Sequence, residues 1–357
     1  MRILIVKLSS IGDVIHTLPA LAELRRRFPS AEVSWVVERS SAELLRESPM
    51  LDHLIEINTR AWRQQWQGPR TWREVLQAVE DLRKHQFDIG FDFQGLLKSG
   101  LVLYLSRARR RVGFETTAMR ERQSRVFLTQ QVPVSDEGHV IEKNLQLIRV
   151  LGIERSGPYQ FPMSIPEEDR QIVEWKLKSL GIGSFAIINP GGNWKGKRWS
   201  PENYAALCQY LYHTHRLVSV VTHAPDEEEL AWQVTEGGRP SAIAFPCTLK
   251  QLAVLADRAS LFVGGDTGPL HLAAARGAPI VAIFGATLAR RNGPFFPDDV
   301  VVQDPDAMPE AYYRRSNDDH YINVPLDQVQ QAIERRLARA SKAQPNQDAR
   351  TATDGSR

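Results

Sequence analysis

The residues best suited to chemistry lie in a glycine turn that carries an acid and a histidine. This turn covers residues 264–271 (Gly-Gly-Asp-Thr-Gly-Pro-Leu-His). An apolar run at 261–263 precedes it and an alanine-rich run follows, which predicts a strand, a tight turn and a helix start. Free N–H groups at such a helix start favour the binding of an anion such as a diphosphate. Asp266 can accept hydrogen bonds from sugar hydroxyls, and His271 can donate to phosphate. The alternative is an ordinary turn capped by Asp266 and Thr267.

A second candidate is the carboxylate of Asp13, close to the amino end. The apolar, β-branched run at residues 2–7 ends in a short Ser-Ser-Ile-Gly loop, and a helical pattern starts at once. This pattern predicts a buried parallel strand, and open α/β sheets bind ligands at the carboxyl ends of their strands. A carboxylate at that place can take a proton from a hydroxyl nucleophile. The alternative role for Asp13 is the N-cap of the next helix.

A loop of glycines and basic residues covers residues 191–197 after another apolar run. Its spacing, G-x-x-x-x-G-K, is that of the P-loop of nucleoside triphosphatases. Arg198 stands where that motif needs Ser or Thr for magnesium, and residues 199–201 delay the helix that should begin at once. We therefore favour a diphosphate contact by Lys197 and the loop glycines. Solvated loop charges and a triphosphatase site are the alternatives.

Acidic residues follow a third apolar run, which ends at residue 221. A carboxylate at the end of a parallel strand can accept both ribose hydroxyls of a nucleotide. For Glu228 and Glu229 we favour a simpler role, in which first-turn acids stabilise a helix dipole.

Composition indicates a globular protein of 357 residues, with 42% hydrophobic and 24% charged residues. No apolar run reaches the ~18–20 residues needed to span a bilayer. Cys208 and Cys247 lack metal-ligand spacing, and a net charge of +3 argues against a general nucleic-acid binder. The first apolar run has no small-residue cleavage site after it, which predicts a cytoplasmic chain and not a secreted one.

Strands and amphipathic helices alternate through the chain, which predicts two doubly wound parallel sheets. The predicted strands are 2–7, 32–38, 53–57, 88–92, 111–114, 185–189, 217–222, 242–245, 261–264 and 280–284. The predicted helices include 20–27, 73–85, 140–151, 201–212 and 249–256. Proline and glycine break the periodicity at 156–166. We therefore place the boundary region near residues 154–184 and expect one domain over 1–160 and another over 161–340. Residues 341–357 lack apolar periodicity, which predicts a disordered tail.

Basic side chains gather in the first half of the chain. Candidate anion contacts in or near its loops are Arg60, Arg63, Lys98, Arg120, Arg122 and Arg125. Arginine suits two-pronged contacts to carboxylate and phosphate. For the run at 107–111 we favour a solvated edge or a contact with an anionic membrane. Trp62 and Trp66 could stack on sugar rings or serve in packing.

Taken together, these stretches resemble the lipopolysaccharide heptosyltransferases over residues 1–340, and the type I branch most of all. The matching stretches are residues 2–7, 9–14, 17–21, 35–38, 60–63, 92–96, 98–99, 120–121, 197–199, 224–227 and 266–268 with His271. The resemblance implies the GT-B fold, in which two Rossmann-like domains face a cleft. It also implies an inverting transfer of heptose from ADP-L-glycero-D-manno-heptose to a Kdo residue of the lipopolysaccharide inner core. No metal or other cofactor is expected.

The same resemblance assigns partners and roles by position. The implied partners are ADP-heptose, Kdo-lipid A and the inner face of the inner membrane, where the enzyme would be peripheral. Asp13 becomes the general base, and Lys197 assists catalysis by contacting the diphosphate. The implied donor site is Gly192, Asn193, Lys197, Glu227, Asp266, Thr267, Gly268 and His271. The implied acceptor site is Ser10, Gly12, Arg60, Arg63, Gln94, Lys98 and Arg120.

Two departures from the type I pattern keep alternatives open. Gly192 and Asn193 replace a threonine pair, with a one-residue length difference that makes the loop closer to that of type II enzymes. Backbone amides would then take over the hydroxyl contacts to phosphate. Pro269-Leu270 also differs from the type I pattern. A type II heptosyltransferase or another core transferase of the family is therefore one alternative. A triphosphatase and a non-catalytic sugar-nucleotide binding module are alternatives from other classes.

Overall fold

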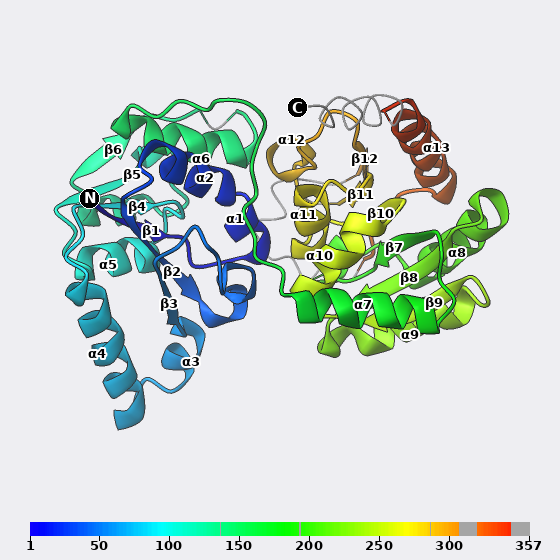
Figure 1. Cartoon of the computed structure of the whole chain (residues 1–357), viewed down its shortest axis with the longest axis horizontal. Coiled ribbons are helices and arrows are strands. Elements are labelled where there is room, and N and C mark those ends of the chain that lie inside the picture. Colours follow the sequence, from blue (N-terminus) through cyan, green and yellow to red (C-terminus); the bar gives the residue numbers. More distant parts are fainter. Residues whose placement is uncertain (136, 193, 286, 307–319, 344–357) are drawn as a thin grey trace, which may run out of the picture. The chain divides into compact units, whose positions relative to one another are not determined.

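The computed structural model describes residues 1–135, 137–192, 194–285, 287–306 and 320–343. The chain divides into two compact units, Met1–Ser164 (unit 1) and Ile165–Arg357 (unit 2), and each forms one layered α/β body (Figure 1). Both contain a six-stranded sheet with helices on its faces, and every strand pairing is parallel. The predicted pair of doubly wound parallel sheets is confirmed.

The sheet of unit 1 has the strand order β3-β2-β1-β4-β5-β6. Its strands are β1 (Arg2–Val6), β2 (Glu32–Glu38), β3 (His53–Ile57), β4 (Ile89–Asp92), β5 (Arg110–Phe114) and β6 (Gln130–Val132). Four of the five residues of β1 are fully buried, as its central place between β2 and β4 requires.

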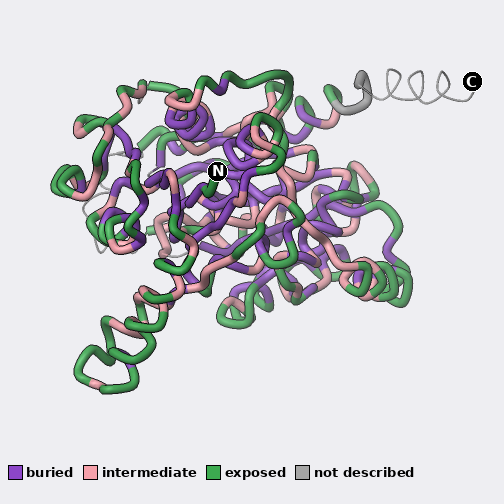
Figure 2. The backbone as a smooth tube through the Cα atoms, turned by 60° about the vertical axis from the view of Figure 1, so that its left-hand side comes forward, coloured by how far each residue is buried: buried purple, intermediate pink, exposed green. Residues whose placement is uncertain are grey.

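Helices of unit 1 cover both faces of this sheet. They are α1 (Ile11–Ile15), α2 (Leu18–Arg27), α3 (Thr59–Gln64), α4 (Pro69–Lys84), α5 (Leu97–Leu105) and α6 (Val140–Ile148). An apolar cluster that includes Leu4, Leu103 and Phe87 joins β1 to α5 and the start of β4. In contrast, α4 buries only Thr71 and Leu82 and is mostly exposed along its length (Figure 2).

Unit 2 repeats the arrangement with the order β12-β11-β10-β7-β8-β9. Its strands are β7 (Phe185–Asn189), β8 (Val218–His223), β9 (Ala242–Pro246), β10 (Leu261–Gly265), β11 (Ile280–Phe284) and β12 (Val300–Gln303). Its helices are α7 (Glu167–Ser179), α8 (Pro201–His215), α9 (Glu228–Gly237), α10 (Leu249–Arg258), α11 (Gly268–Ala275), α12 (Ala289–Asn292) and α13 (Leu326–Ala343). A separate apolar cluster around Trp199 and Tyr204 packs α8 and α13 against this sheet.

The ten predicted strands all form, with ends shifted by one residue at most at either end. The edge strands β6 and β12 lie outside the ten. The predicted boundary region near 154–184 contains α7, and α13 reaches Ala343, three residues into the predicted tail. The rest of that tail lies outside the described residues. Among the residues that are described, no helix combines the length and the apolarity that a bilayer crossing requires.

Candidate active site

Each sheet reverses its winding direction between two central strands, and this switch point is where open α/β sheets bind ligands. In unit 1 the switch lies between β1 and β4, and in unit 2 it lies between β7 and β10. Asp13 lies in the first turn of α1, directly after β1, and Gln94 lies in the loop after β4. The loops after β7 and β10 contain Lys197 and Asp266. The sequence-predicted side chains therefore gather at the two switch points.

In unit 2, the carboxylate of Asp266 contacts two basic side chains at the end of β10. Its Oδ2 lies 2.9 Å from Lys197 Nζ, and its Oδ1 lies 3.1 Å from His271 Nε2. Lys197 Nζ also donates to the Asp266 carbonyl oxygen at 3.3 Å. Asp266 and His271 are buried, with exposed fractions of 8% and 4%. Three residues separated by up to 74 positions thus form one buried charged group.

This charged group keeps Asp266 ionised. Burial alone would raise the pKa of Asp266, because a charge is poorly solvated inside the protein. The hydrogen bond and charge of His271, together with Lys197, outweigh burial and hold that pKa far below its ordinary value. Asp266 is therefore an acceptor at neutral pH, suited to sugar hydroxyls or to orienting Lys197 and His271.

Beside this group, helix α11 begins with an N-terminus that no side chain caps. Thr267 is the N-cap residue in extended conformation, and it makes no side-chain cap hydrogen bond. The first N–H groups of such a helix carry partial positive charge and suit an anion. The alternative prediction, a helix start capped by side chains, does not hold for Thr267. Pro269 lies in the first turn of the helix, as predicted.

Glycines at the end of β10 allow the lysine loop to approach closely. A Cβ at Gly265 would lie 2.8 Å from the carbonyl oxygen of Lys197, and a Cβ at Gly264 would lie 2.9 Å from that of Asn189. Both separations are too short for a side chain. The Asn189 amide donates to the Thr222 carbonyl oxygen at 3.2 Å, so the ends of β7, β8 and β10 are held together.

The glycine loop after β7 is closed by Glu227. The N–H of Gly192 donates to Glu227 Oε1 at 3.1 Å, and the N–H of Ala224 donates to Oε2 at 3.3 Å. A Cβ at Gly191 would lie 2.3 Å from Glu227 Oε1, so a side chain there would displace the Glu227 carboxylate. Asn193 lies outside the described residues.

The lysine loop does not have P-loop geometry. Lys197 ends a 3-10 turn (Lys195–Lys197), and Arg198 is extended. Helix α8 begins only at Pro201, with Ser200 as its cap. A P-loop leads straight into its helix, whose N-terminal amides then surround the phosphates. The spacing G-x-x-x-x-G-K is therefore a coincidence of sequence.

In unit 1, Asp13 lies where α1 begins, directly after β1. Its Oδ1 is 3.2 Å from Lys7 Nζ, and its Oδ2 accepts from the Ser10 N–H at 2.9 Å and from the Ser10 hydroxyl at 3.2 Å. Ser10 is the N-cap of α1, so Asp13 stands three positions further on and is not the cap. The Asp13 side chain remains 41% exposed, whereas Lys7 is 5% exposed.

The neighbours of Asp13 hold it in the charged form. Burial opposes ionisation, but the charge of Lys7 and the hydrogen bonds from Ser10 outweigh it and lower the pKa of Asp13. Sequence reasoning missed Lys7, because a lysine at the end of an apolar strand gives no sign of which way it points. Lys7 Nζ also donates to the Phe93 carbonyl oxygen at 2.9 Å, which fixes it beneath the carboxylate.

Gln94 ties the loop after β4 to the loop after β1. Its Oε1 accepts from the Leu8 N–H at 2.7 Å, and its Nε2 donates to the Ser9 carbonyl oxygen at 2.8 Å. Asp92 lies beneath it, buried, and accepts from the Ser99 hydroxyl at 3.0 Å and from two backbone N–H groups. Burial raises the pKa of Asp92. Asp92 thus supports the loop that carries Gln94.

The basic residues predicted for the acceptor occupy exposed positions of unit 1. Arg60 and Arg63 lie on α3, and Arg120 follows β5. Within the described part of the chain these three guanidinium groups have no ion-pair partner. Lys98 at the start of α5 lies 3.7 Å from the buried Glu38 carboxylate. Gly12 is buried inside α1.

Two arginines of the run at 107–111, Arg110 and Arg111, make structural contacts within unit 1. Arg111 donates to the carbonyl oxygens of Phe127 and Ala108 at 2.7 and 3.1 Å. Arg110 donates to Gln130 on the neighbouring strand at 3.0 Å. These contacts hold the β5–β6 edge.

One acidic pair with metal-motif spacing, Asp304 and Asp306, forms a turn. Asp304 Oδ1 accepts from the Asp306 N–H at 2.9 Å, and its Oδ2 accepts from the Asn323 N–H at 2.8 Å. Both oxygens of Asp304 are engaged with the backbone. Elsewhere in unit 2, the buried hydroxyl of Thr287 follows β11. It has no hydrogen-bond partner among the described residues.

Comparison with known proteins agrees with this geometry. Residues 75–321 match the family model described as glycosyltransferase family 9 (heptosyltransferase). The lipopolysaccharide heptosyltransferase 1 of Pseudomonas aeruginosa is 31% identical over 294 residues, which cover 80% of this chain and 79% of that protein. The lipopolysaccharide heptosyltransferase 3 of Escherichia coli is 26% identical over 282 residues, 77% of this chain and 81% of the other.

A solved structure, E. coli heptosyltransferase WaaC with ADP, superimposes with a TM-score of 0.75 and 25% identity, covering 94% of this chain and all of that one. The same enzyme with ADP-2-deoxy-2-fluoro heptose gives a TM-score of 0.72 over 88% of this chain and 98% of that one. The GT-B fold and the glycosyltransferase class follow from these matches. The chain is a member of glycosyltransferase family 9, the heptosyltransferases.

Proposed function

We propose that the chain is a type I heptosyltransferase, which moves heptose from ADP-L-glycero-D-manno-heptose to a Kdo residue of the lipopolysaccharide inner core. The assignment of the donor, ADP-heptose, rests on the Asp266–Lys197–His271 group beside the uncapped start of α11. ADP and an ADP-heptose analogue are bound by the related WaaC structures, which supports the same donor here.

In this proposal, unit 2 stabilises the leaving group. When the glycosidic bond breaks, negative charge develops on the ADP diphosphate. Lys197 and the N-terminal amides of α11 supply positive charge where that charge appears, and fixed donors of this kind contribute strongly to catalysis. Glu227 is assigned to the ribose hydroxyls and Asp266 to the heptose. The site holds protein cations for the diphosphate, so we propose that transfer proceeds without a metal ion.

Unit 1 supplies the base and the acceptor contacts in the same proposal. A sugar hydroxyl is a poor nucleophile near neutral pH, and a placed carboxylate that takes its proton accelerates attack by roughly 10²–10⁴-fold. Asp13 is ionised and partly exposed, as a base must be. A single displacement by the hydroxyl inverts the anomeric carbon and needs one carboxylate only.

The acceptor assignment rests on the exposed arginines of unit 1. Kdo carries a carboxylate, and its lipid carries phosphates, so Arg60, Arg63 and Arg120 offer complementary two-pronged contacts. The type I alternative is favoured over type II by the matches at residues 60–63 and 120–121. A type II enzyme would use a core that already carries one heptose.

An assay of ADP release separates the candidate classes. With ADP-heptose and Kdo-lipid A together, a transferase releases ADP, and mass spectrometry finds the acceptor heavier by one heptose. Acceptor-independent release would indicate a nucleotide hydrolase, and donor binding without release would indicate a binding module. A product formed only from a heptosylated core would replace type I by type II.

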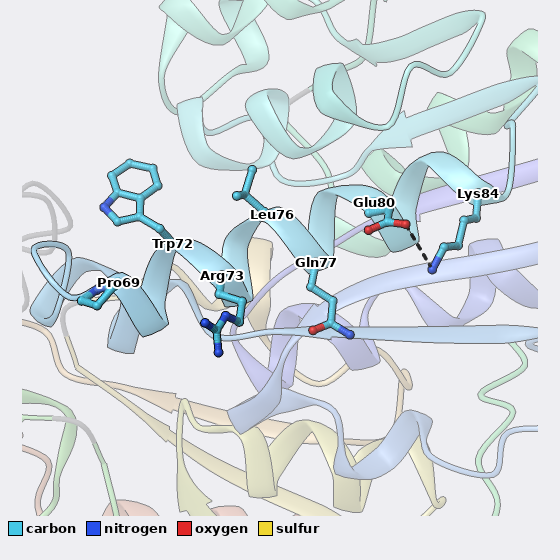
Figure 3. Close-up of a pocket in the computed structure, with 7 residues that line it drawn as sticks. All are labelled: Pro69, Trp72, Arg73, Leu76, Gln77, Glu80 and Lys84. Carbon is cyan, nitrogen blue, oxygen red and sulfur yellow. Dashed lines mark ion pairs between the residues drawn. The ribbon is translucent and has the colours of Figure 1, made fainter.

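We also propose that α4 contacts the membrane surface in which the lipid acceptor resides. A shallow hollow along this helix is lined by Pro69, Trp72, Arg73, Leu76, Gln77, Glu80 and Lys84 (Figure 3). Trp72 and Leu76 project from one side of the helix and are 55% and 67% exposed. Exposed tryptophan with nearby arginine suits the interface of an anionic bilayer.

Vesicle sedimentation tests this contact. Trp72→Ala should weaken binding to vesicles that contain phosphatidylglycerol by at least ~5-fold, because apolar area and charge act together at the interface. Trp175→Ala is the matched control, since Trp175 is 69% exposed on α7 in unit 2. Equal loss in both variants, or equal binding to uncharged phosphatidylcholine vesicles, would refute the assignment.

A further inference from the structure

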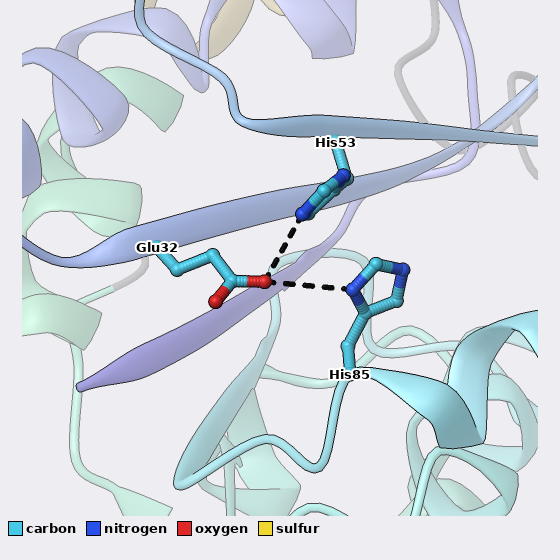
Figure 4. A group of neighbouring side chains, drawn as sticks. All are labelled: Glu32, His53 and His85. Carbon is cyan, nitrogen blue, oxygen red and sulfur yellow. Dashed lines mark hydrogen bonds and ion pairs between the residues drawn. The ribbon is translucent and has the colours of Figure 1, made fainter.

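Three side chains that bind metals well converge at the amino ends of the unit 1 strands (Figure 4). Glu32 is the first residue of β2, His53 is the first residue of β3, and His85 follows the last residue of α4. His53 Nε2 lies 3.0 Å from Glu32 Oε1, and His85 Nδ1 lies 3.5 Å from the same oxygen. One carboxylate oxygen therefore faces two imidazole nitrogens.

The sheet register explains why these residues meet. His53 pairs with Ser34 across β2 and β3, and paired residues in a parallel sheet point to the same face. Glu32 is two residues before Ser34 on β2, so it shares that face with His53. The carboxyl end of α4 then brings His85 to the same place, where its ring lies 4.3 Å from that of His53.

The separations of the two imidazole nitrogens from Glu32 Oε1 fit a tetrahedral zinc site. Zinc binds imidazole nitrogen and carboxylate oxygen at about 2.0–2.1 Å, which places neighbouring tetrahedral ligands about 3.3 Å apart. The two measured separations, 3.0 and 3.5 Å, lie on either side of that value. All three ligand atoms lie within 4.8 Å of one another. A water molecule would complete the coordination.

Neighbouring groups orient two of the three ligands. Arg2 Nε lies 3.4 Å from Glu32 Oε2, so it engages the oxygen that faces away from the imidazoles. The ring of His85 stacks on Phe87 with a centroid separation of 5.6 Å and an angle of 27°. Partners that fix the orientation of a ligand commonly improve metal affinity.

We propose that Glu32, His53 and His85 form a zinc site that fastens α4 to the sheet. The site lies at the amino ends of the strands, whereas Asp13 follows the carboxyl end of β1, so it takes no part in heptose transfer. A zinc ion would link β2, β3 and the end of α4. That helix buries only Thr71 and Leu82, so such a link adds anchorage where core packing is sparse.

Calorimetric titration of metal-stripped, full-length protein with zinc chloride tests the site. We expect one equivalent of zinc to bind and to raise the Tm by at least ~3 °C at saturation. His53→Ala, His85→Ala and Glu32→Gln should each weaken binding at least ~10-fold. His213→Ala is the matched control, because His213 is exposed near the end of α8 in unit 2.

Cobalt provides an independent readout of the ligands. Co²⁺ bound to two imidazoles and a carboxylate should give visible bands that His53→Ala removes, without the intense near-ultraviolet band of a cobalt thiolate. A thiolate band would place the metal at Cys208 or Cys247 and overturn the proposal. Absence of zinc binding, or equal weakening in His213→Ala, would overturn it as well. If His85→Ala fails to fold, His53→Asn at an exposed strand start gives the same test.

Discussion

At the residue scale, Asp13 has the two properties that a general base needs: it is ionised, and it is accessible. We predict that Asp13→Asn lowers turnover by at least ~10²-fold and leaves ADP-heptose affinity almost unchanged, because the amide cannot take a proton and donor contacts belong to unit 2. Steady-state rates and donor titration measure both effects. Asp81→Asn, at an exposed carboxylate on α4, is the control. Near-normal turnover in Asp13→Asn would remove this residue from the mechanism.

A second prediction at this scale concerns Lys197. Lys197→Ala should weaken donor binding and slow transfer together, because the ammonium meets diphosphate charge in both the ground state and the transition state. Lys195→Ala in the same loop is the control, since its ammonium lies over the Tyr321 ring at 4.9 Å. Lys197→Ala also leaves the buried Asp266 without one partner, so the Tm should be recorded beside the kinetics.

The metal requirement of transfer is a third prediction. Saturating EDTA should leave the rate of heptose transfer unchanged, because in the proposed mechanism Lys197 and the α11 amides stabilise the developing charge. Rates before and after chelation, with magnesium added back, give the answer. Loss of activity on chelation and its return with magnesium would show that a metal ion contributes to catalysis.

Sequence predicted those site residues that directly follow strands, and it missed those whose partners depend on tertiary structure. Asp13 and Asp266 were found because each comes after an apolar run, and such runs end at the binding edge of a parallel sheet. Gln94 was assigned only through the family resemblance. Lys7 was missed, because its position at the end of β1 does not indicate that its ammonium group pairs with Asp13 six residues later. The register that brings Glu32 and His53 together is likewise not visible in either strand alone.

At the scale of elements, the link between α13 and the sheet depends on Asp299. Its Oδ1 accepts from the Ile280 N–H at 3.1 Å and from Arg336 Nε at 3.0 Å. Burial outweighs this ion pair and raises the pKa of Asp299 to about 6. Folding therefore favours the protonated acid. The contribution of Asp299 to stability is complete below its unfolded pKa of about 4, and it is lost as the pH rises towards 6.

We predict that the wild type loses stability relative to Asp299→Asn between pH 4 and 6, because only the wild type has a carboxyl group at position 299 that titrates in this range. Above pH 7 the difference in stability should be constant. Urea unfolding across this range measures it. Asp327→Asn, at an exposed position of α13, should show no such trend. A difference that grows in the opposite direction would mean that the ion pair with Arg336 dominates.

Periodicity identified every central strand and the edge strands β3 and β9, but it missed the edge strands β6 and β12. Central strands such as β1 and β10 are continuous apolar runs, because helices cover both of their faces. The edge strand β6 has the sequence Gln-Gln-Val and forms only because β5 offers it hydrogen bonds. Helix α5 is apolar on most sides, so its amphipathic signal is weak. It contains Gly100, where an added Cβ would lie 2.5 Å from the Ser124 hydroxyl oxygen.

At the scale of the whole molecule, the donor and acceptor are assigned to different units, and this division can be tested. Arg60→Ala, Arg63→Ala and Arg120→Ala should each raise the acceptor KM and leave donor affinity unchanged. Arg120→Lys should also be impaired, since lysine cannot make a two-pronged contact with a carboxylate. Arg149→Ala, at an exposed position of unit 1, is the control. Normal acceptor binding in all three variants would refute the acceptor assignment.

The two apolar clusters described above belong to different units, one around Leu4 and Phe87 and the other around Trp199 and Tyr204. A chain with two cores need not melt as one cooperative body, so each unit can have its own melting temperature. A ligand shifts only the transition of the part that binds it. ADP should therefore delay the unfolding of unit 2 alone, and calorimetry in its presence would assign each transition to its half of the chain.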